Sequence, residues 1–132
     1  MQASNSLSRY APQALAVLRI VTALIFIIHG TQKLFGFPAA PASGLPGAFT
    51  LFWFGAILEA FGGFLILIGL WTRPVAFVLA GEMAYAYWMF HAPRSIYPLL
   101  NGGDAAILYC FIFLYLVFAG AGAWSVDSRS KG

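Results

Sequence analysis

Four long apolar stretches, separated by short polar or glycine- and proline-rich segments, make up most of this chain. They cover approximately residues 14–35, 49–71, 74–92 and 104–124. Each approaches the roughly 20 residues that a helix needs to cross a bilayer. None shows the alternation of apolar and polar residues that is typical of a membrane β-barrel. The pattern therefore predicts an all-α polytopic membrane protein, a four-transmembrane-helix bundle formed by a single domain over residues 1–132.

Composition and charge agree with a membrane protein. Of the 132 residues, 61% are hydrophobic and 8% are charged, whereas soluble domains contain about 25% charged residues. The net charge of +3 comes from basic residues that stand singly at the ends of the apolar stretches. Because no basic cluster could follow a phosphate backbone, nucleic acid is not an expected partner.

The positions of the basic residues and tryptophans predict the topology. One side of the membrane would hold most of the cations, namely Arg9, Arg19, Arg73, Arg129 and Lys131. The other side would hold Lys33 and Arg94. The positive-inside rule then places both termini in the cytoplasm. Two pairs of tryptophans would mark the interfaces, Trp71 and Trp124 inside and Trp53 and Trp88 outside. The polar segment Met1–Pro12 runs directly into the first span, which favours a retained signal anchor over a cleaved signal peptide.

The first span carries a stripe of polar and aromatic residues on one helical face. Its members are Arg19, Thr22, Phe26, His29 and Lys33. At 100° per residue they share one face, which is expected to contact protein rather than lipid. Arg19 and Lys33 could alternatively be anchors that extend to the membrane surface. For His29, a hydrogen bond to a neighbouring helix is favoured over a metal ligand.

Two carboxylates lie near the middle of predicted spans. A charge at the centre of a membrane helix costs roughly 2.5–3.5 kcal/mol, so it needs a partner, a proton or a function. Glu59 shares its face with Gly62 and Gly63, where a neighbouring helix can approach closely. It could pair with a basic residue of the first span, Lys33 or His29, or be held neutral by burial. Glu82 lies in the third span, which is expected to start at Pro74, and could have a function or only form a structural hydrogen bond.

The remaining polar residues cluster toward the outer side. Asn101 is expected to cap the last span, and Asp104 lies in its first turn, where the helix dipole favours a carboxylate. In a four-helix bundle such side chains can meet between facing helices. The sequence therefore predicts a polar pocket that opens outward, formed by His29, Lys33, Glu59, Glu82, Asn101 and Asp104.

Motifs of other chemistries are missing from the sequence. There is no nucleotide-binding glycine loop, no closely spaced metal-ligand pair and no nucleophile with an obvious base. Cys110 is the single cysteine, which excludes a dithiol relay. Haem held between His29 and His91 is not expected, because His91 lies at a helix end and projects away from Glu82. No metal site is predicted.

Several ordered motifs resemble the DoxX family of small bacterial inner-membrane proteins. They are His29-Gly30-Thr31-Gln32-Lys33-Leu34-Phe35-Gly36, Glu59 with Gly62-Gly63, Gly69-Leu70-Trp71-Thr72-Arg73, Asn101-Gly102-Gly103-Asp104, and Gly122 with Ser125 and Asp127. The resemblance implies a multi-pass protein of the inner membrane and an association with redox complexes, since related proteins form the membrane subunit of a thiosulfate:quinone oxidoreductase. Residues that match the family pattern are His29, Lys33, Glu59, Arg73 and Asn101. Asp104 replaces the more usual Glu, and Glu82 belongs to only some members.

Three functions remain open from the sequence. The chain could be the membrane subunit of a quinone-linked oxidoreductase, in which His29, Lys33 and Glu59 bind a quinone head group at the polar end of an apolar pocket. It could be a proton-coupled carrier of a small molecule that uses Glu59 and Glu82, which would require a homodimer. It could also be a non-catalytic anchoring or assembly subunit. Expected partners are the lipid bilayer and either other subunits of a redox complex or a second copy.

Overall fold

The computed structural model describes residues 6–130, and this part of the chain forms helices and no strands. The helices, in chain order, are α2 (Ala11–Phe35), α3 (Leu51–Ile68), α4 (Thr72–Ala86), α5 (Pro98–Asn101), α6 (Asp104–Ala119) and α7 (Val126–Ser130). A π-helix, η1 (Tyr87–His91), continues α4 without a break, and a 3₁₀ turn, η2 (Ala92–Arg94), follows it. The predicted all-helical fold is confirmed. Lys131 and residues 1–5 of the predicted signal anchor lie outside the described residues.

Each of the four apolar stretches forms one long helix, but several ends differ from the prediction. The last helix stops at Ala119 instead of continuing to residue 124, because Gly120 has a positive φ of 79°. The third helix begins at Thr72 and not at Pro74. Helices α2 and α3 are long and apolar enough to cross a membrane, and α6 is a shorter apolar helix.

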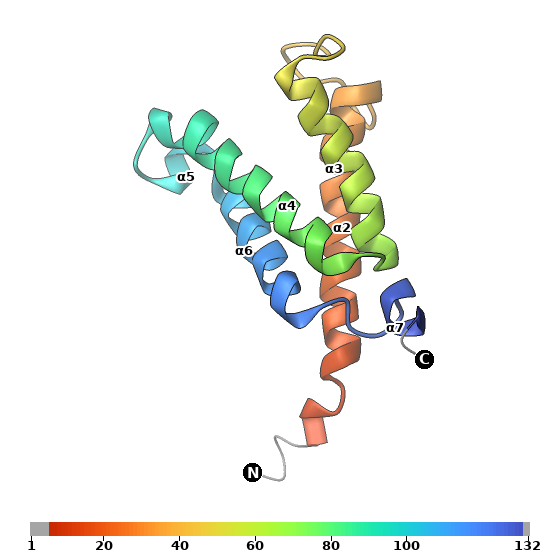
Figure 1. Ribbon diagram of the computed structural model, residues 1–132. Coiled ribbons are helices and arrows are strands. Elements are labelled where there is room, and N and C mark those ends of the chain that lie inside the picture. The colour runs from red at the N-terminus through yellow and green to blue at the C-terminus, as the bar shows by residue number, and fades with distance from the viewer. Residues whose placement is uncertain (1–5, 131–132) are drawn as a thin grey trace.

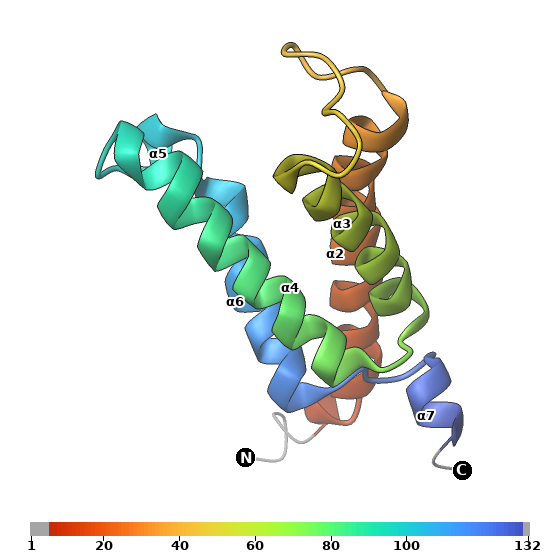
Figure 2. The ribbon, with the colours of Figure 1, turned by 45° about the horizontal axis from the view of Figure 1, so that its top comes forward.

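The helices are arranged as two antiparallel pairs that diverge from one end (Figure 1). Helix α2 packs along α3, and α4 packs along α6; Figure 2 shows the same two pairs from another side. At one end, here called the closed end, the Trp71–Thr72 turn, the segment between α6 and α7, and α7 itself lie together. At the other end, the open end, the α2–α3 loop and α5 lie far apart. The two pairs therefore form a V.

Small residues allow α2 and α3 to approach closely. A Cβ added to Gly30 would lie 2.6 Å from the backbone nitrogen of Ala60 and 2.7 Å from the carbonyl oxygen of Ala56. One added to Gly63 would lie 2.7 Å from the side chain of Ile27. The expected packing role of the glycine face of α3 is thus confirmed. Such close approach is how helices associate in lipid, where no hydrophobic force drives them together.

Aromatic packing joins the two pairs at the centre. Phe26 of α2 meets the rings of Tyr109 and Phe113 of α6 edge-on, with centroid separations of 5.0 and 4.9 Å. Arg19, Thr22 and Phe26 are buried, as the stripe on the first span predicted. The stripe therefore faces protein from the closed end of α2 to Phe26, whereas His29, further along it, is exposed.

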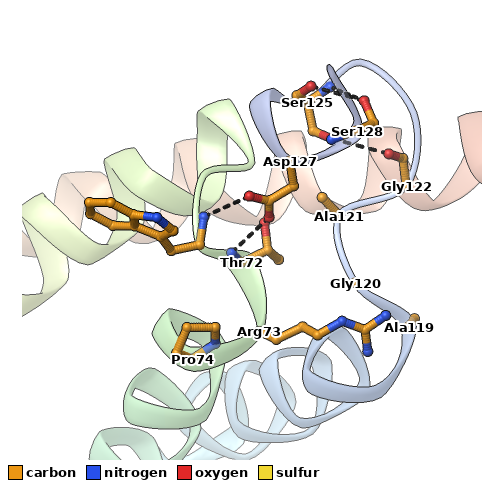
Figure 3. A pocket seen from close by; sticks show the side chains of 11 residues that line it. Thr72, Arg73, Pro74, Ala119, Gly120, Ala121, Gly122, Ser125, Asp127 and Ser128 are labelled. Atoms are coloured by element: carbon orange, nitrogen blue, oxygen red, sulfur yellow. Dashed lines mark hydrogen bonds between the residues drawn. The ribbon is translucent and has the colours of Figure 1, made fainter. Parts of the chain in front are cut away.

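Polar side chains fasten the closed end. Arg19 is fully buried and donates to the carbonyl oxygens of Ala121, Ala123 and Trp124, which follow α6. Asp127 accepts from the backbone nitrogens of Trp71 and Thr72, both at 2.9 Å (Figure 3). This carboxylate caps α4 from a distant part of the chain, which explains why α4 begins before Pro74.

Candidate functional site

An ion pair between α2 and α3 lies near the open end. Nζ of Lys33 is 3.1 Å from Oε1 and 3.3 Å from Oε2 of Glu59. The Glu59 side chain is 6% exposed and the Lys33 side chain is 30% exposed. Of the alternatives left open for Glu59, the structure shows the pairing with Lys33. A buried carboxylate that is bridged through both oxygens is firmly placed.

Two cavities lie on either side of this ion pair, between the arms of the V. The first, here called the Glu82 chamber, has a volume of about 270 Å³. The second, the His29 chamber, has a volume of about 220 Å³. Lys33, Glu59 and Ala86 line both cavities. The ion pair is therefore a partition that can interact with a molecule in either chamber.

The Glu82 chamber combines apolar walls with an incompletely satisfied carboxyl group. The carboxyl of Glu82 interacts electrostatically with Glu59 and Lys33. Its Oε2 lies against Gly55, and its Oε1 is buried without a hydrogen-bond partner. The walls are mostly aromatic or aliphatic: Leu51, Phe52, Phe54, Leu58, Tyr85 and Phe90. A buried polar atom without a partner costs about 1–3 kcal/mol, so the Glu82 carboxyl is incompletely satisfied in this chamber.

The His29 chamber is bounded by a histidine that is hydrogen-bonded within its own helix. Nδ1 of His29 lies 3.0 Å from the carbonyl oxygen of Ile25, one turn earlier in α2. Because a carbonyl oxygen only accepts, Nδ1 donates this bond, and the predicted hydrogen bond to a neighbouring helix was wrong. The ring packs edge-on against Tyr109 at 5.6 Å and is exposed. His29 thus lies at an accessible edge of this chamber.

Asn101 organises the loop beside the His29 chamber and does not cap α6. It is 1% exposed, donates to Tyr87 Oη at 3.1 Å and to the Ser95 carbonyl at 3.0 Å, and accepts from the Gly103 nitrogen at 2.8 Å. His91 donates through Nδ1 to the Asn101 carbonyl at 3.0 Å. The predicted cap was wrong, because the N-cap position of α6 is Gly103. Asn101 instead turns the chain into α6 and fixes His91, which lines the chamber.

The structure gathers four of the six predicted pocket residues at the chambers. Lys33, Glu59, Glu82 and His29 line them, whereas Asn101 supports the adjoining loop. Asp104 occupies the first turn of α6 as expected, but it is exposed and lines neither chamber. Sequence reasoning missed Tyr109, which lines the His29 chamber. The signal that could have indicated it was the polar hydroxyl of Tyr109 within an apolar predicted span.

Another pocket, of about 330 Å³, lies at the closed end beside the Asp127 cap (Figure 3). Its polar groups hold the helices together. Arg73 extends toward Ala119 and donates through Nη1 to the carbonyls of Val117 and Phe118 at 2.9 and 2.6 Å. A cation at the end of α6 complements the helix dipole. We therefore assign this cluster to structure and place the candidate site at the chambers.

Comparisons with known proteins agree with this architecture. The DoxX family model matches residues 14–92. An uncharacterized protein of Haemophilus influenzae is 43% identical over 95% of this chain and 96% of its own length. The inner membrane protein YphA of Escherichia coli is 27% identical over 89% and 91%, and the uncharacterized membrane protein Rv3486 of Mycobacterium tuberculosis is 27% identical over 89% and 82%. No solved structure matches. Together with the apolar helices, these relatives establish that the chain is an integral membrane protein and belongs to the DoxX family.

Proposed function

We propose that this protein is the membrane subunit of a quinone-linked oxidoreductase system and that the Lys33–Glu59–Glu82 cluster binds the quinone head group. The observation that carries the proposal is the buried Lys33–Glu59 ion pair, which lines two cavities, with the unpartnered Oε1 of Glu82 beside it. Ligand sites of this kind combine apolar walls with a few convergent polar groups. A quinone head group is flat and apolar and bears oxygens at its two ends, so it suits such a chamber.

The charges of the cluster also support proton-linked chemistry. Two carboxyl groups face a single ammonium group. If both were ionised, one negative charge would remain uncompensated in a low-dielectric environment. A proton on one carboxyl, or a donor on the ligand, balances the site. Quinone reduction and oxidation involve protons as well as electrons, and a positioned carboxyl can accept or donate one.

The proposal includes a topology of four membrane-crossing segments in the bacterial inner membrane with both termini in the cytoplasm. The closed end carries Arg19 and Arg73, while Lys33 belongs to the open end. With the positive-inside rule, the closed end would face the cytoplasm and the chambers would open toward the outer side. The relative YphA is described as an inner membrane protein, which supports the same location.

The test is to purify the protein in a mild detergent that retains lipids and to identify bound quinone by mass spectrometry and absorbance. Wild type should retain a quinone, and Glu59→Gln should lose most of it, because the substitution removes the charge that holds Lys33. Asp104→Asn is the matched control, since this exposed carboxylate lines neither chamber. Retention unaffected by Glu59→Gln, or no quinone in wild type even after added ubiquinone and menaquinone, would refute the proposal.

A proton-coupled carrier is the second candidate, and the excess carboxyl group favours it. Such a carrier would need a homodimer and would move its substrate in response to a pH gradient across liposomes. Glu82→Gln should abolish this response if Glu82 carries the transported proton. Flux that ignores the gradient would exclude the carrier. If neither quinone nor flux is found, and substitutions only lower stability together with recovery of partner subunits, an anchoring role would replace both.

A further inference from the structure

A long apolar groove runs between α3 and α4 outside the polar chambers. It encloses about 600 Å³ and starts beside the Trp71 turn at the closed end. Side chains of α3 form one wall and side chains of α4 the other: Phe54, Ile57, Leu58, Phe61, Leu65, Pro74, Val75 and Val78. Both ribbon views show these two helices separating from that turn (Figures 1 and 2). The groove therefore lies between α3 and α4 near the closed end.

The groove is continuous with the Glu82 chamber. Phe54 and Leu58 line both. The stretch of α4 from Pro74 to Glu82 is about 12 Å long at 1.5 Å per residue. A linear molecule could therefore place a polar head beside Glu82 and extend an apolar chain toward Trp71. The half-exposed side chains of Val78 and Ile57 at its walls indicate that the groove is reached from the lipid.

The charges decide which kind of amphiphile fits. A phospholipid would bring a phosphate, but the cation at this site, Lys33, is already bridged by both oxygens of Glu59. The groove itself has no charged lining residue among those described. The carboxyl of Glu82 interacts with Glu59 and Lys33, and its Oε1 is enclosed by protein. An uncharged head therefore suits this site, whereas an anionic head would lie beside two carboxyl groups without a free cation.

We propose that the α3–α4 groove holds the apolar tail of a membrane-dissolved ligand whose uncharged head lies in the Glu82 chamber. This inference rests on the proposed function and adds two statements to it. The ligand enters laterally from the bilayer, and its tail lies between α3 and α4. Affinity for the tail arises from close packing, because lipid itself is as apolar as the groove.

The test compares two probes on the full-length protein in detergent micelles, a tail-free methylated benzoquinol and the same head with a decyl chain. Val78→Phe narrows the groove from α4, and Val21→Phe on α2 is the matched control. Val78 is 51% exposed and Val21 is 52% exposed, and Val21 does not line the groove. Ile57→Trp narrows the groove from the α3 wall and serves as a second variant. Circular dichroism and size-exclusion chromatography check that each variant is folded.

We expect Val78→Phe and Ile57→Trp to weaken binding of the decyl probe about tenfold, which corresponds to about 1.4 kcal/mol. Binding of the tail-free probe should stay unchanged in both, and Val21→Phe should bind both probes as wild type does.

Other outcomes would overturn the inference in distinguishable ways. If the groove variants weaken the binding of both probes equally, they disturb the head site. If they weaken the binding of neither probe, the tail lies elsewhere. In both cases the inference about the tail fails and the proposed head site survives. Native mass spectrometry that shows a phospholipid retained by wild type and lost in Val78→Phe would assign the groove to an acyl chain. If neither probe binds wild type, the proposed function fails and this inference fails with it.

Discussion

Breaking the Lys33–Glu59 ion pair one side at a time should reveal how strongly the two residues are coupled. Lys33→Met removes the cation while keeping most of the side-chain length. The Glu59 carboxylate, whose side chain is 6% exposed, would then face the Glu82 carboxyl without a positive charge nearby. Glu59→Gln removes the anion and leaves a lysine that is 30% exposed and can extend toward water.

The geometry sets the expected magnitude. At 3.1 Å and an effective dielectric constant of 20, the attraction between two unit charges is about 5 kcal/mol. Solvent at the Lys33 end and the desolvation of the carboxylate offset part of it, which leaves a coupling of about 2 kcal/mol. We expect Lys33→Met to lower the free energy of unfolding by about 3 kcal/mol and Glu59→Gln by about 1.5 kcal/mol. The double variant should lose about 2.5 kcal/mol, less than the sum of the two.

The assay is a double-mutant cycle on unfolding in mixed micelles of a mild detergent and sodium dodecyl sulfate, followed by circular dichroism. Arg94→Met is the matched control, because Arg94 is an exposed cation at the open end that does not belong to this ion pair. This substitution should change the free energy of unfolding by less than about 0.5 kcal/mol. If the losses from the two single substitutions simply add in the double variant, the ion pair contributes no net coupling and the reasoning is refuted.

Two further predictions concern the packing that supports the site. Gly30→Leu should lower the free energy of unfolding by about 3 kcal/mol, because its Cβ would lie 2.6 Å from the Ala60 nitrogen. Gly81→Leu is the control and should be nearly neutral, because a Cβ at Gly81 would have nothing within 4 Å. Equal effects of the two substitutions would contradict the close approach of α2 and α3. Arg19→Met should lower the free energy of unfolding by about 3 kcal/mol, since three carbonyls, one of them in a fully buried hydrogen bond, lose their donor. Exposed Arg9→Met should change little. A stable Arg19→Met protein would show that the closed end does not depend on this residue.

The helical stripes of this protein could be predicted from the sequence because they depend only on helix geometry. The spacing of Arg19, Thr22 and Phe26 predicted a protein-facing side of the first helix, and all three are buried. For Glu59, the sequence offered a pairing with the first span as one alternative and a neutral carboxyl as the other. It left Glu59 with two basic partners to choose between, because the choice between Lys33 and His29 depends on how far α2 and α3 slide along each other.

The features that the sequence did not predict depend on contacts between distant segments. Asp127 caps α4 from far along the chain, so no local signal could show that the helix begins at Thr72. The expected cap at Asn101 failed because its side chain is used by Tyr87, Ser95 and Gly103. The two chambers and the α3–α4 groove exist because the helix pairs diverge, and this divergence is a tertiary property that no periodicity encodes.

The two ends of the V differ in what their charged groups contact. At the closed end, Asp127 and Arg73 bridge segments by bonding to backbone donors and carbonyls. At the open end, the Lys33–Glu59 ion pair and Glu82 border cavities. Buried polar atoms without a partner occur at both ends, on Arg19 and Thr72 as well as on Glu82, so the cavities beside the ion pair and not the unpartnered atoms distinguish the candidate site. A scaffold fastened at one end can keep cavities open at the other, and a ligand that occupies them should stabilise the whole protein in proportion to its affinity.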